Sequence, residues 1–158
     1  AQGAQPIISY NYGAKNKERV KAIFKLLTIV CFSYSLCLWS SIMLFPRGFA
    51  SIFTSDQTLV PFTAKMLRIY CGGLCIFGIQ IACQMTFVSI GSSLSSIAVA
   101  VFRKFIILIP LIYIVPHLVN NPVIGVYLAE PIADITAVLF TICLFSFKFR
   151  KALNKISN

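Results

Sequence analysis

Two acidic residues inside an apolar stretch are the side chains most able to do chemistry in this sequence. Glu130 and Asp134 lie four positions apart, so a helix presents both on one face. An acid at the centre of a membrane helix costs about 2.5 kcal/mol or more to insert, unless a cavity, a partner or a proton compensates its charge. Pro131 stands between the two acids and leaves the carbonyl of Tyr127 without its helical hydrogen bond. This pattern fits a cation or proton site.

A second interpretation of the acid pair stays open. Glu130 and Asp134 can instead face other helices and form ion pairs with Arg or Lys residues that lie outside this chain. Gln80 and Gln84 raise a similar choice, because they also lie four positions apart on one helix face. Their amides fit either a hydrogen bond between helices or contact with a substrate in a cavity.

Signatures of enzymes are absent from the sequence. There is one histidine, no cysteine–histidine metal spacing, no phosphate-cradling glycine loop and no GxSxG motif. We therefore expect no enzyme activity and no cofactor, and the pattern assigns no metal ligand. All six cysteines lie in apolar stretches, which favours small, apolar, reduced side chains in helices.

The composition indicates a membrane protein. Hydrophobic residues make up 58% of the chain, and 14 basic and 4 acidic residues are all the charges among 158. Soluble domains carry about a quarter charged residues. The net charge of +10 is clustered between long apolar runs, which indicates contact with membrane lipid and argues against a nucleic-acid partner.

Apolar runs of the length of a bilayer define the expected elements. We expect an all-α integral membrane protein with the end of one helix over 1–13, four complete spanning helices, and a basic tail over 148–158. The predicted spans are 22–45, 62–90, 97–119 and 123–147. The turn-forming residues 91–96 separate the second span from the third.

Several residues predict local features of these helices. Gly13 suits the position just past a helix end, where the backbone needs a positive φ. Pro110 must kink the third span, and Pro116 ends it. Arg103 and Lys104 either extend to the inner headgroups or precede a membrane segment that begins near Phe105.

The distribution of basic residues orients the chain. Three lie at the predicted outer ends of the spans, namely Arg47, Lys65 and Arg68, and the remaining eleven lie at inner positions. The positive-inside rule then places both ends of the segment in the cytoplasm. We expect a multi-pass protein of the plasma (inner) membrane.

Three segments in order resemble the MATE (multidrug and toxic compound extrusion) transporters, in particular their bacterial multidrug efflux branch. They are "QPIISYNYGAKN" followed by "RV", then "IPLIYIV", then "NPVIGVYLAEPIAD". The residues that carry the resemblance include Gln5, Pro6, Tyr12, Gly13 and Pro131. MATE transporters have twelve helices in two six-helix halves, so the resemblance implies the last third of such a protein, within its C-terminal six-helix bundle.

The resemblance implies secondary active multidrug efflux. Organic cations or amphipathic drugs would be exchanged for Na⁺ or H⁺ by alternating access, with the remaining N-terminal helices of the same chain as partners. One departure concerns the coupling ion: some members of the family place a cation-coordinating acid in the helix that corresponds to 62–90, where this sequence has none. The alternatives are a lipid-linked saccharide flippase of related architecture and a non-transporting membrane subunit.

Overall fold

The computed structural model describes residues 1–54 and 56–157, and every regular element in them is a helix. Two short segments are not α-helical: η1 is a 3₁₀-helix and η2 is a π-helix. The elements in order are α1 (Ala4–Gly13), α2 (Lys17–Leu44), α3 (Pro46–Phe53), α4 (Val60–Tyr70), η1 (Cys71–Gly73), α5 (Leu74–Ser89), α6 (Ser93–Val101), η2 (Phe102–Leu108), α7 (Ile109–Leu118) and α8 (Pro122–Ser157).

Four helical stretches are long and apolar enough to cross a bilayer. They are α2, the continuous α4–η1–α5 stretch, the continuous α6–η2–α7 stretch, and α8. The short α1 precedes them. The expected fold class is therefore confirmed: an all-α integral membrane protein with the end of one helix and four complete spans.

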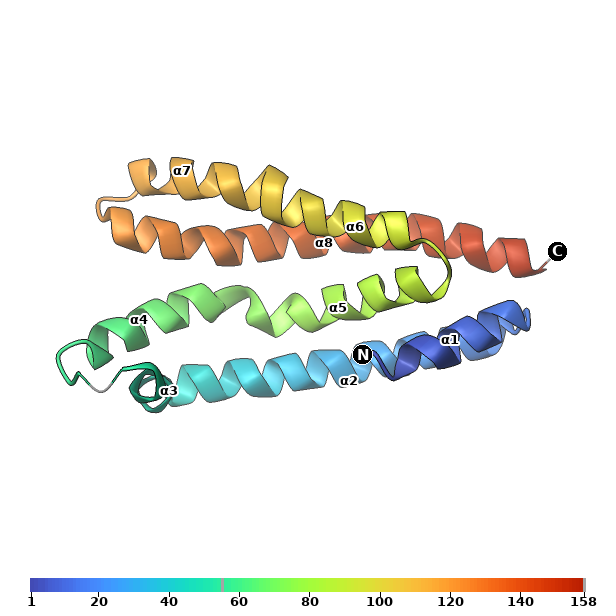
Figure 1. The fold of residues 1–158 in the computed structure, drawn as a ribbon, viewed down its shortest axis with the longest axis horizontal. Helices are drawn as coiled ribbons and strands as arrows, with labels where there is room; N and C mark the ends of the chain where they lie inside the picture. Colours follow the sequence, from blue (N-terminus) through green and yellow to red (C-terminus); the bar gives the residue numbers. More distant parts are fainter. Residues whose placement is uncertain (55, 158) are drawn as a thin grey trace.

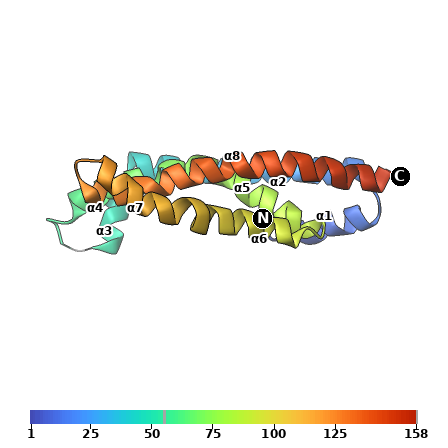
Figure 2. The same cartoon turned by 90° about the horizontal axis from the view of Figure 1, so that it is seen from above.

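The spans form an elongated bundle (Figure 1). The α4–η1–α5 span lies between α2 and α8, and the α6–η2–α7 span packs along α8. Figure 2 shows the same bundle turned by 90°, with the C-terminus at the end where α1 and α2 meet. We call this the aromatic end, because Phe24, Phe145 and Phe149 stack there, and we call the opposite end the α3 end.

The best-packed core lies at the aromatic end. The rings of Phe24 and Phe145 stack at 4.6 Å between centroids, and fully buried Phe87 meets Phe145 edge-on. Ile8 of α1 and Val20 of α2 are also fully buried in this cluster. Large apolar side chains elsewhere, such as Tyr34 and Phe105, remain exposed, as expected for a surface that faces lipid.

The end of α1 differs from the prediction made for Gly13. Gly13 is the last residue of the helix, and Lys15 takes the positive φ of 56°. Lys15 N–H donates to the Tyr12 carbonyl and Asn16 N–H to the Asn11 carbonyl, which together form a Schellman motif with Lys15 at its left-handed position. The helix therefore includes Gly13, and these two hydrogen bonds satisfy its last carbonyls.

Helix boundaries near the aromatic end also differ from those predicted. The third span begins at Ser93 rather than at 97, because Gly91 (φ 75°) closes α5 with a second Schellman motif and the new helix follows directly. The predicted tail over 148–158 is instead a continuation of α8 through Ser157, and residue 158 lies outside the described residues. Packing explains this helix: Lys148 Nζ donates to Ser95 Oγ at 2.6 Å, and Leu153 is buried.

The third span accommodates Pro110 through the π-helix η2, which ends just before it. Proline lacks an N–H and its ring crowds the carbonyl four residues earlier, here that of Ile106. The wider turn of a π-helix moves that carbonyl away from the ring. Pro116 lies inside α7, which continues to Leu118, so the prediction that Pro116 ends the helix was wrong.

Replacing Gly91 with alanine should destabilise the fold through the backbone alone. No atom lies within 4 Å of a Cβ built at Gly91, so the cost of G91A is the left-handed φ, about 1–2 kcal/mol. G91N should keep most of the stability, since asparagine tolerates this conformation. The measurement is the melting temperature of the intact protein in detergent. G48A, at an open helical glycine, is the control, and equal melting temperatures for G91A and G48A would contradict the argument.

Candidate functional site

One guanidinium group joins the two acids that the sequence singles out. Arg103 of η2 donates from Nε to Asp134 Oδ1 at 2.7 Å and from Nη2 to Glu130 Oε1 at 2.9 Å. Its Nη2 also forms an ion pair with Asp134. Lys104 Nζ lies 3.7 Å from Glu130 Oε1. Two carboxylates are thus balanced by two basic side chains, and we call these four residues the charge cluster.

Three members of the charge cluster are largely removed from solvent within this chain. The exposed fractions of the side chains are 14% for Arg103, 12% for Glu130 and 8% for Asp134, against 53% for Lys104. Buried charges are tolerated when they are paired and hydrogen-bonded, and removing one partner leaves an uncompensated charge. Arg103 is therefore the residue on which burial of both acids depends.

An aromatic side chain supports Arg103 from a third element. The Cζ atom of Arg103 lies 4.8 Å from the centroid of the Phe77 ring on α5, a cation–π distance. Tyr70 of α4 and Tyr127 of α8 meet edge-on at 6.3 Å between centroids, one helical turn from Glu130 toward the α3 end. The charge cluster is thus enclosed by side chains of α4, α5, η2 and α8.

Two glycines of η1 allow α8 to approach the second span closely. A Cβ built at Gly73 would lie 2.7 Å from Asp134 Cβ, and one built at Gly72 would lie 3.4 Å from Pro131 Cβ. Any side chain at Gly73 would therefore push Asp134 away. The acids lie where the second span passes through a 3₁₀ turn and the third through a π-helix, so both irregular segments contact the same stretch of α8.

The partner of the acids comes from this chain, which corrects two predictions. The ion-pair interpretation placed the basic partners outside the chain, whereas Arg103 and Lys104 supply them. Arg103 was also expected either to extend to the inner headgroups or to precede a membrane segment that begins near Phe105. It lies ten residues into the span that begins at Ser93, about 15 Å along the helix, and its contacts turn it into the bundle. Without Arg103 and Lys104, nine basic residues remain at the predicted inner positions and three at the outer ones, so the predicted orientation does not change.

The sequence held a signal for this pairing. Arg103 and Asp134 lie at comparable distances on either side of the turn at 119–121, in two helices joined by a short loop. Short loops make consecutive helices antiparallel neighbours, so opposite charges at matching depth can meet. The signal was ambiguous because a long basic side chain near a span boundary equally well reaches the headgroups.

The two glutamines form a separate feature. Gln84 Nε2 donates to the Ser96 carbonyl at 3.5 Å, which links α5 to α6. Gln80 is 2% exposed, and among the described residues its Oε1 has no hydrogen-bond partner. The hydrogen bonds found in the described part of the chain do not connect either amide to the charge cluster.

Most of the remaining motif residues lie away from the charge cluster. Gln5, Pro6, Tyr12 and Gly13 belong to α1 at the aromatic end, where Gln5 and Tyr12 are half-buried and Pro6 and Gly13 are exposed. Pro131 is different, because it is buried in α8 between the two acids and against Gly72.

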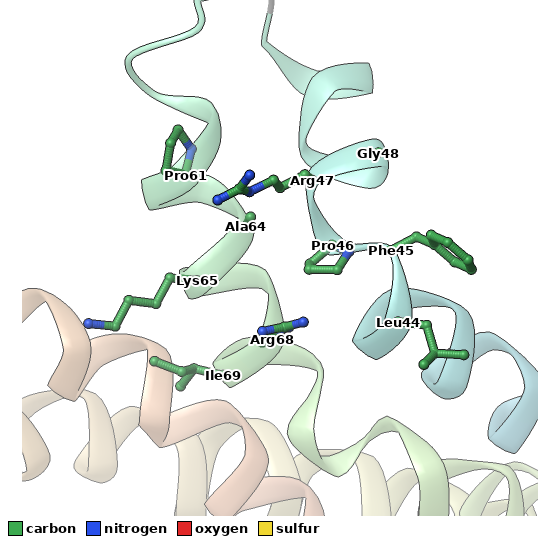
Figure 3. Close-up of a pocket in the computed structure, with 10 residues that line it drawn as sticks. All are labelled: Leu44, Phe45, Pro46, Arg47, Gly48, Pro61, Ala64, Lys65, Arg68 and Ile69. Carbon is green, nitrogen blue, oxygen red and sulfur yellow. The ribbon is translucent and has the colours of Figure 1, made fainter.

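The α3 end holds a pocket of about 740 Å³ between the α2–α3 corner and α4. Figure 3 shows Arg47 and Arg68 extending into this gap from opposite walls. Arg68 Nη2 donates to the Met43 carbonyl at 2.9 Å, near the end of α2. The pocket is lined by exposed basic residues and apolar side chains and includes no member of the charge cluster, so we do not assign the candidate site to it.

Adjacent glycines offer a test of the close approach of α8. G73A places a methyl group against Asp134 and should destabilise the protein by about 1–3 kcal/mol, as overpacking does. G72A is the matched control, because its methyl group would make an ordinary van der Waals contact with Pro131. Thermal melting of the intact protein in detergent compares the two. Equal stability of G73A and G72A would contradict the packing described for Asp134.

Comparisons with known proteins agree with this architecture. The family model MatE matches residues 1–114. An inward-facing structure of a multidrug resistance MATE family transporter of the MOP superfamily matches with a TM-score of 0.89 and 22% identity, over 99% of this chain and 36% of that chain. An outward-facing structure of a multidrug resistance MATE family transporter of the MOP superfamily matches with a TM-score of 0.85 and 21% identity, over 96% of this chain and 33% of that chain. A search of curated proteins gives no match.

A third structure, the Vibrio cholerae MATE transporter VcmN in its bent form, matches with a TM-score of 0.80 and 18% identity, over 96% of this chain and 33% of that chain. At these identities the structures show a shared fold, and this chain spans about a third of their length. The family model covers well over half of the sequence, and the four apolar spans follow the fold of the matched transporters. This chain therefore belongs to the MatE family of multi-pass membrane transporters.

Proposed function

We propose that this chain works as the C-terminal third of a twelve-helix exporter, which moves organic cations or amphipathic drugs outward in exchange for Na⁺ or H⁺. The observation that carries the proposal is the MatE match over 1–114, together with likeness along nearly the whole chain to transporters described as multidrug resistance proteins. The remaining helices of the transporter would complete the cavity.

The charge cluster is our candidate for the part that responds to the coupling ion. Glu130 and Asp134 do not act as an open negative surface here, because Arg103 and Lys104 offset their charge. An ion drives a conformational change only if it binds one state better than another. The buried acid pair would meet that requirement if it binds the ion in one state and Arg103 in the other.

The likeness to both inward-facing and outward-facing structures supports motion of this part as one body. The TM-scores are 0.89 and 0.85, so the same helix arrangement matches both. Alternating access would then come from movement of this bundle against the other half. We propose that the protein lies in the plasma membrane with both ends of this segment in the cytoplasm. Nine basic residues lie at the aromatic end and three at the α3 end, and the positive-inside rule places the more basic end in the cytoplasm.

Dye efflux tests the proposed export and identifies the coupling ion. The transporter that contains this chain should export a cationic dye such as ethidium from drug-sensitive bacterial cells. Efflux that stops when sodium is replaced by potassium would establish sodium coupling. Efflux that persists without sodium and collapses with the pH gradient would establish proton coupling. Absence of dye efflux under both conditions would overturn drug export and favour the flippase alternative.

Replacing both acids tests their part in transport. E130Q/D134N should lower dye efflux by about tenfold, within the range of coupling energies that link ion and substrate binding. Because this variant leaves Arg103 unpaired, the amount of protein in the membrane is measured alongside. E18Q is the control, since Glu18 is an exposed acid paired only with Lys21 among the described residues. Unchanged efflux per molecule in E130Q/D134N would remove the acids from the mechanism.

A further inference from the structure

We infer that Arg103 is a tethered internal cation that occupies the acid pair until the coupling cation, Na⁺ or H⁺, displaces it. This inference rests on the proposed ion-coupled export and assigns a competitor to the coupling ion. The juxtaposition that carries it is one guanidinium bridging two buried carboxylates at 2.7 and 2.9 Å.

The acids retain capacity for a second cation. The contacts of Arg103 and Lys104 use Oδ1 of Asp134 and Oε1 of Glu130. Among the described residues no hydrogen bond or ion pair is found on the second oxygen of either acid. Pro131 also leaves the Tyr127 carbonyl without a helical donor. Two carboxylate oxygens and a carbonyl offer the hard oxygen ligands that metal cations prefer, and either carboxylate can accept a proton.

Arg103 and an incoming cation compete for the same two acids. A positive charge within hydrogen-bonding distance weakens the affinity of a carboxylate for any further cation. Burial strengthens the effect, because water screens these side chains little. The cation therefore binds fully only when Arg103 withdraws.

Arg103 also has a contact that does not depend on the acids. The Phe77 ring already lies 4.8 Å from its Cζ atom, so the guanidinium can keep a cation–π contact after it leaves the acids. Its backbone belongs to η2, and π-helical turns are common at functional sites. Exchange therefore does not require Arg103 to leave the bundle.

Displacement of Arg103 from the acids would also affect η1, the 3₁₀ segment that interrupts the second span. Asp134 packs against Gly73, so its position is linked to η1. The charged and titratable groups near the pair are Arg103 and Lys104 on η2, Tyr70 on α4 and Cys71 on η1, and Tyr127 of α8 contacts Tyr70. Cys71 lies close enough to Asp134 to sense its charge, whereas its neighbour Cys75 bonds to the Gly72 carbonyl.

These two cysteines give a readout that does not depend on transport. Two variants of the complete transporter retain Cys71 or Cys75 as the sole cysteine, and each is alkylated with N-ethylmaleimide in membrane vesicles. One titration varies Na⁺ against K⁺, and the other varies pH. The ratio of the two alkylation rates removes the general effect of pH on thiols. We expect the ratio to change with one of the two cations, because thiol reactivity depends on nearby charge.

The decisive comparison introduces R103Q into both single-cysteine variants. Removing the competitor should lower the cation concentration at the midpoint of the response by about ten- to a thousandfold, the effect of one opposite charge on a carboxylate. K104Q is the matched control, and its exposed, more distant amine should shift the midpoint at most about fivefold. R103K serves where R103Q does not accumulate, and should shift the midpoint in the same direction by less.

Three outcomes separate the inference from the proposed function. A lowered midpoint in R103Q or R103K, with a small shift in K104Q, supports displacement of Arg103. An unchanged midpoint in both Arg103 variants, or a Cys71 response to neither cation while the parent exports dye, overturns it. A shifted midpoint in a parent that exports no cationic dye keeps Arg103 as the competitor and overturns the drug substrate.

Discussion

Burial of two acids in an apolar bundle is the constraint on which the rest of this structure depends. Glu130 and Asp134 are tolerated because Arg103 reaches them from the neighbouring span. Asp134 also packs against Gly73, which permits a close approach of α8 to the second span, and Arg103 itself lies in the π-helix η2 of the third span. Irregular backbone deep in a membrane protein is tolerated where protein surrounds it. Gly73 of the 3₁₀ turn is buried against α8, whereas η2 contacts α8 on one side, through Arg103, and leaves Phe105 and Ile106 exposed on the other.

The aromatic end and the region around the charge cluster differ in how their helices are held together. The aromatic end is held by stacked Phe24, Phe145 and Phe149 and by the contact of Lys148 with Ser95. Its packing leaves few ways to rearrange, as in any dense core. Toward the α3 end, the second and third spans each contain a helical irregularity and α8 contains Pro131. Local adjustment is therefore easier near the charges than near the aromatic rings.

Much of the fold could be predicted from the sequence because each span is a long apolar run, and because acids four positions apart share a helix face. The pairing of Arg103 with these acids depends on which helices are neighbours and at what depth, which periodicity does not specify. Helix ends were misplaced for a related reason. At Lys15, two backbone hydrogen bonds outweigh the preference for glycine. From Lys148 onward, tertiary packing keeps α8 helical where charge alone suggested a tail.

The neutral charge cluster changes how acids in this position can act. An unpaired acid pair would attract any cation at all times, and its field would favour positively charged substrates throughout the cycle. With Arg103 in place, the attraction is cancelled at short range until the pairing changes. Selectivity for a state of the transporter, rather than for charge in general, then follows from whether Arg103 is engaged. Buried ion pairs contribute little net stability compared with apolar packing. A small net contribution to stability agrees with the switching role that we propose for the cluster.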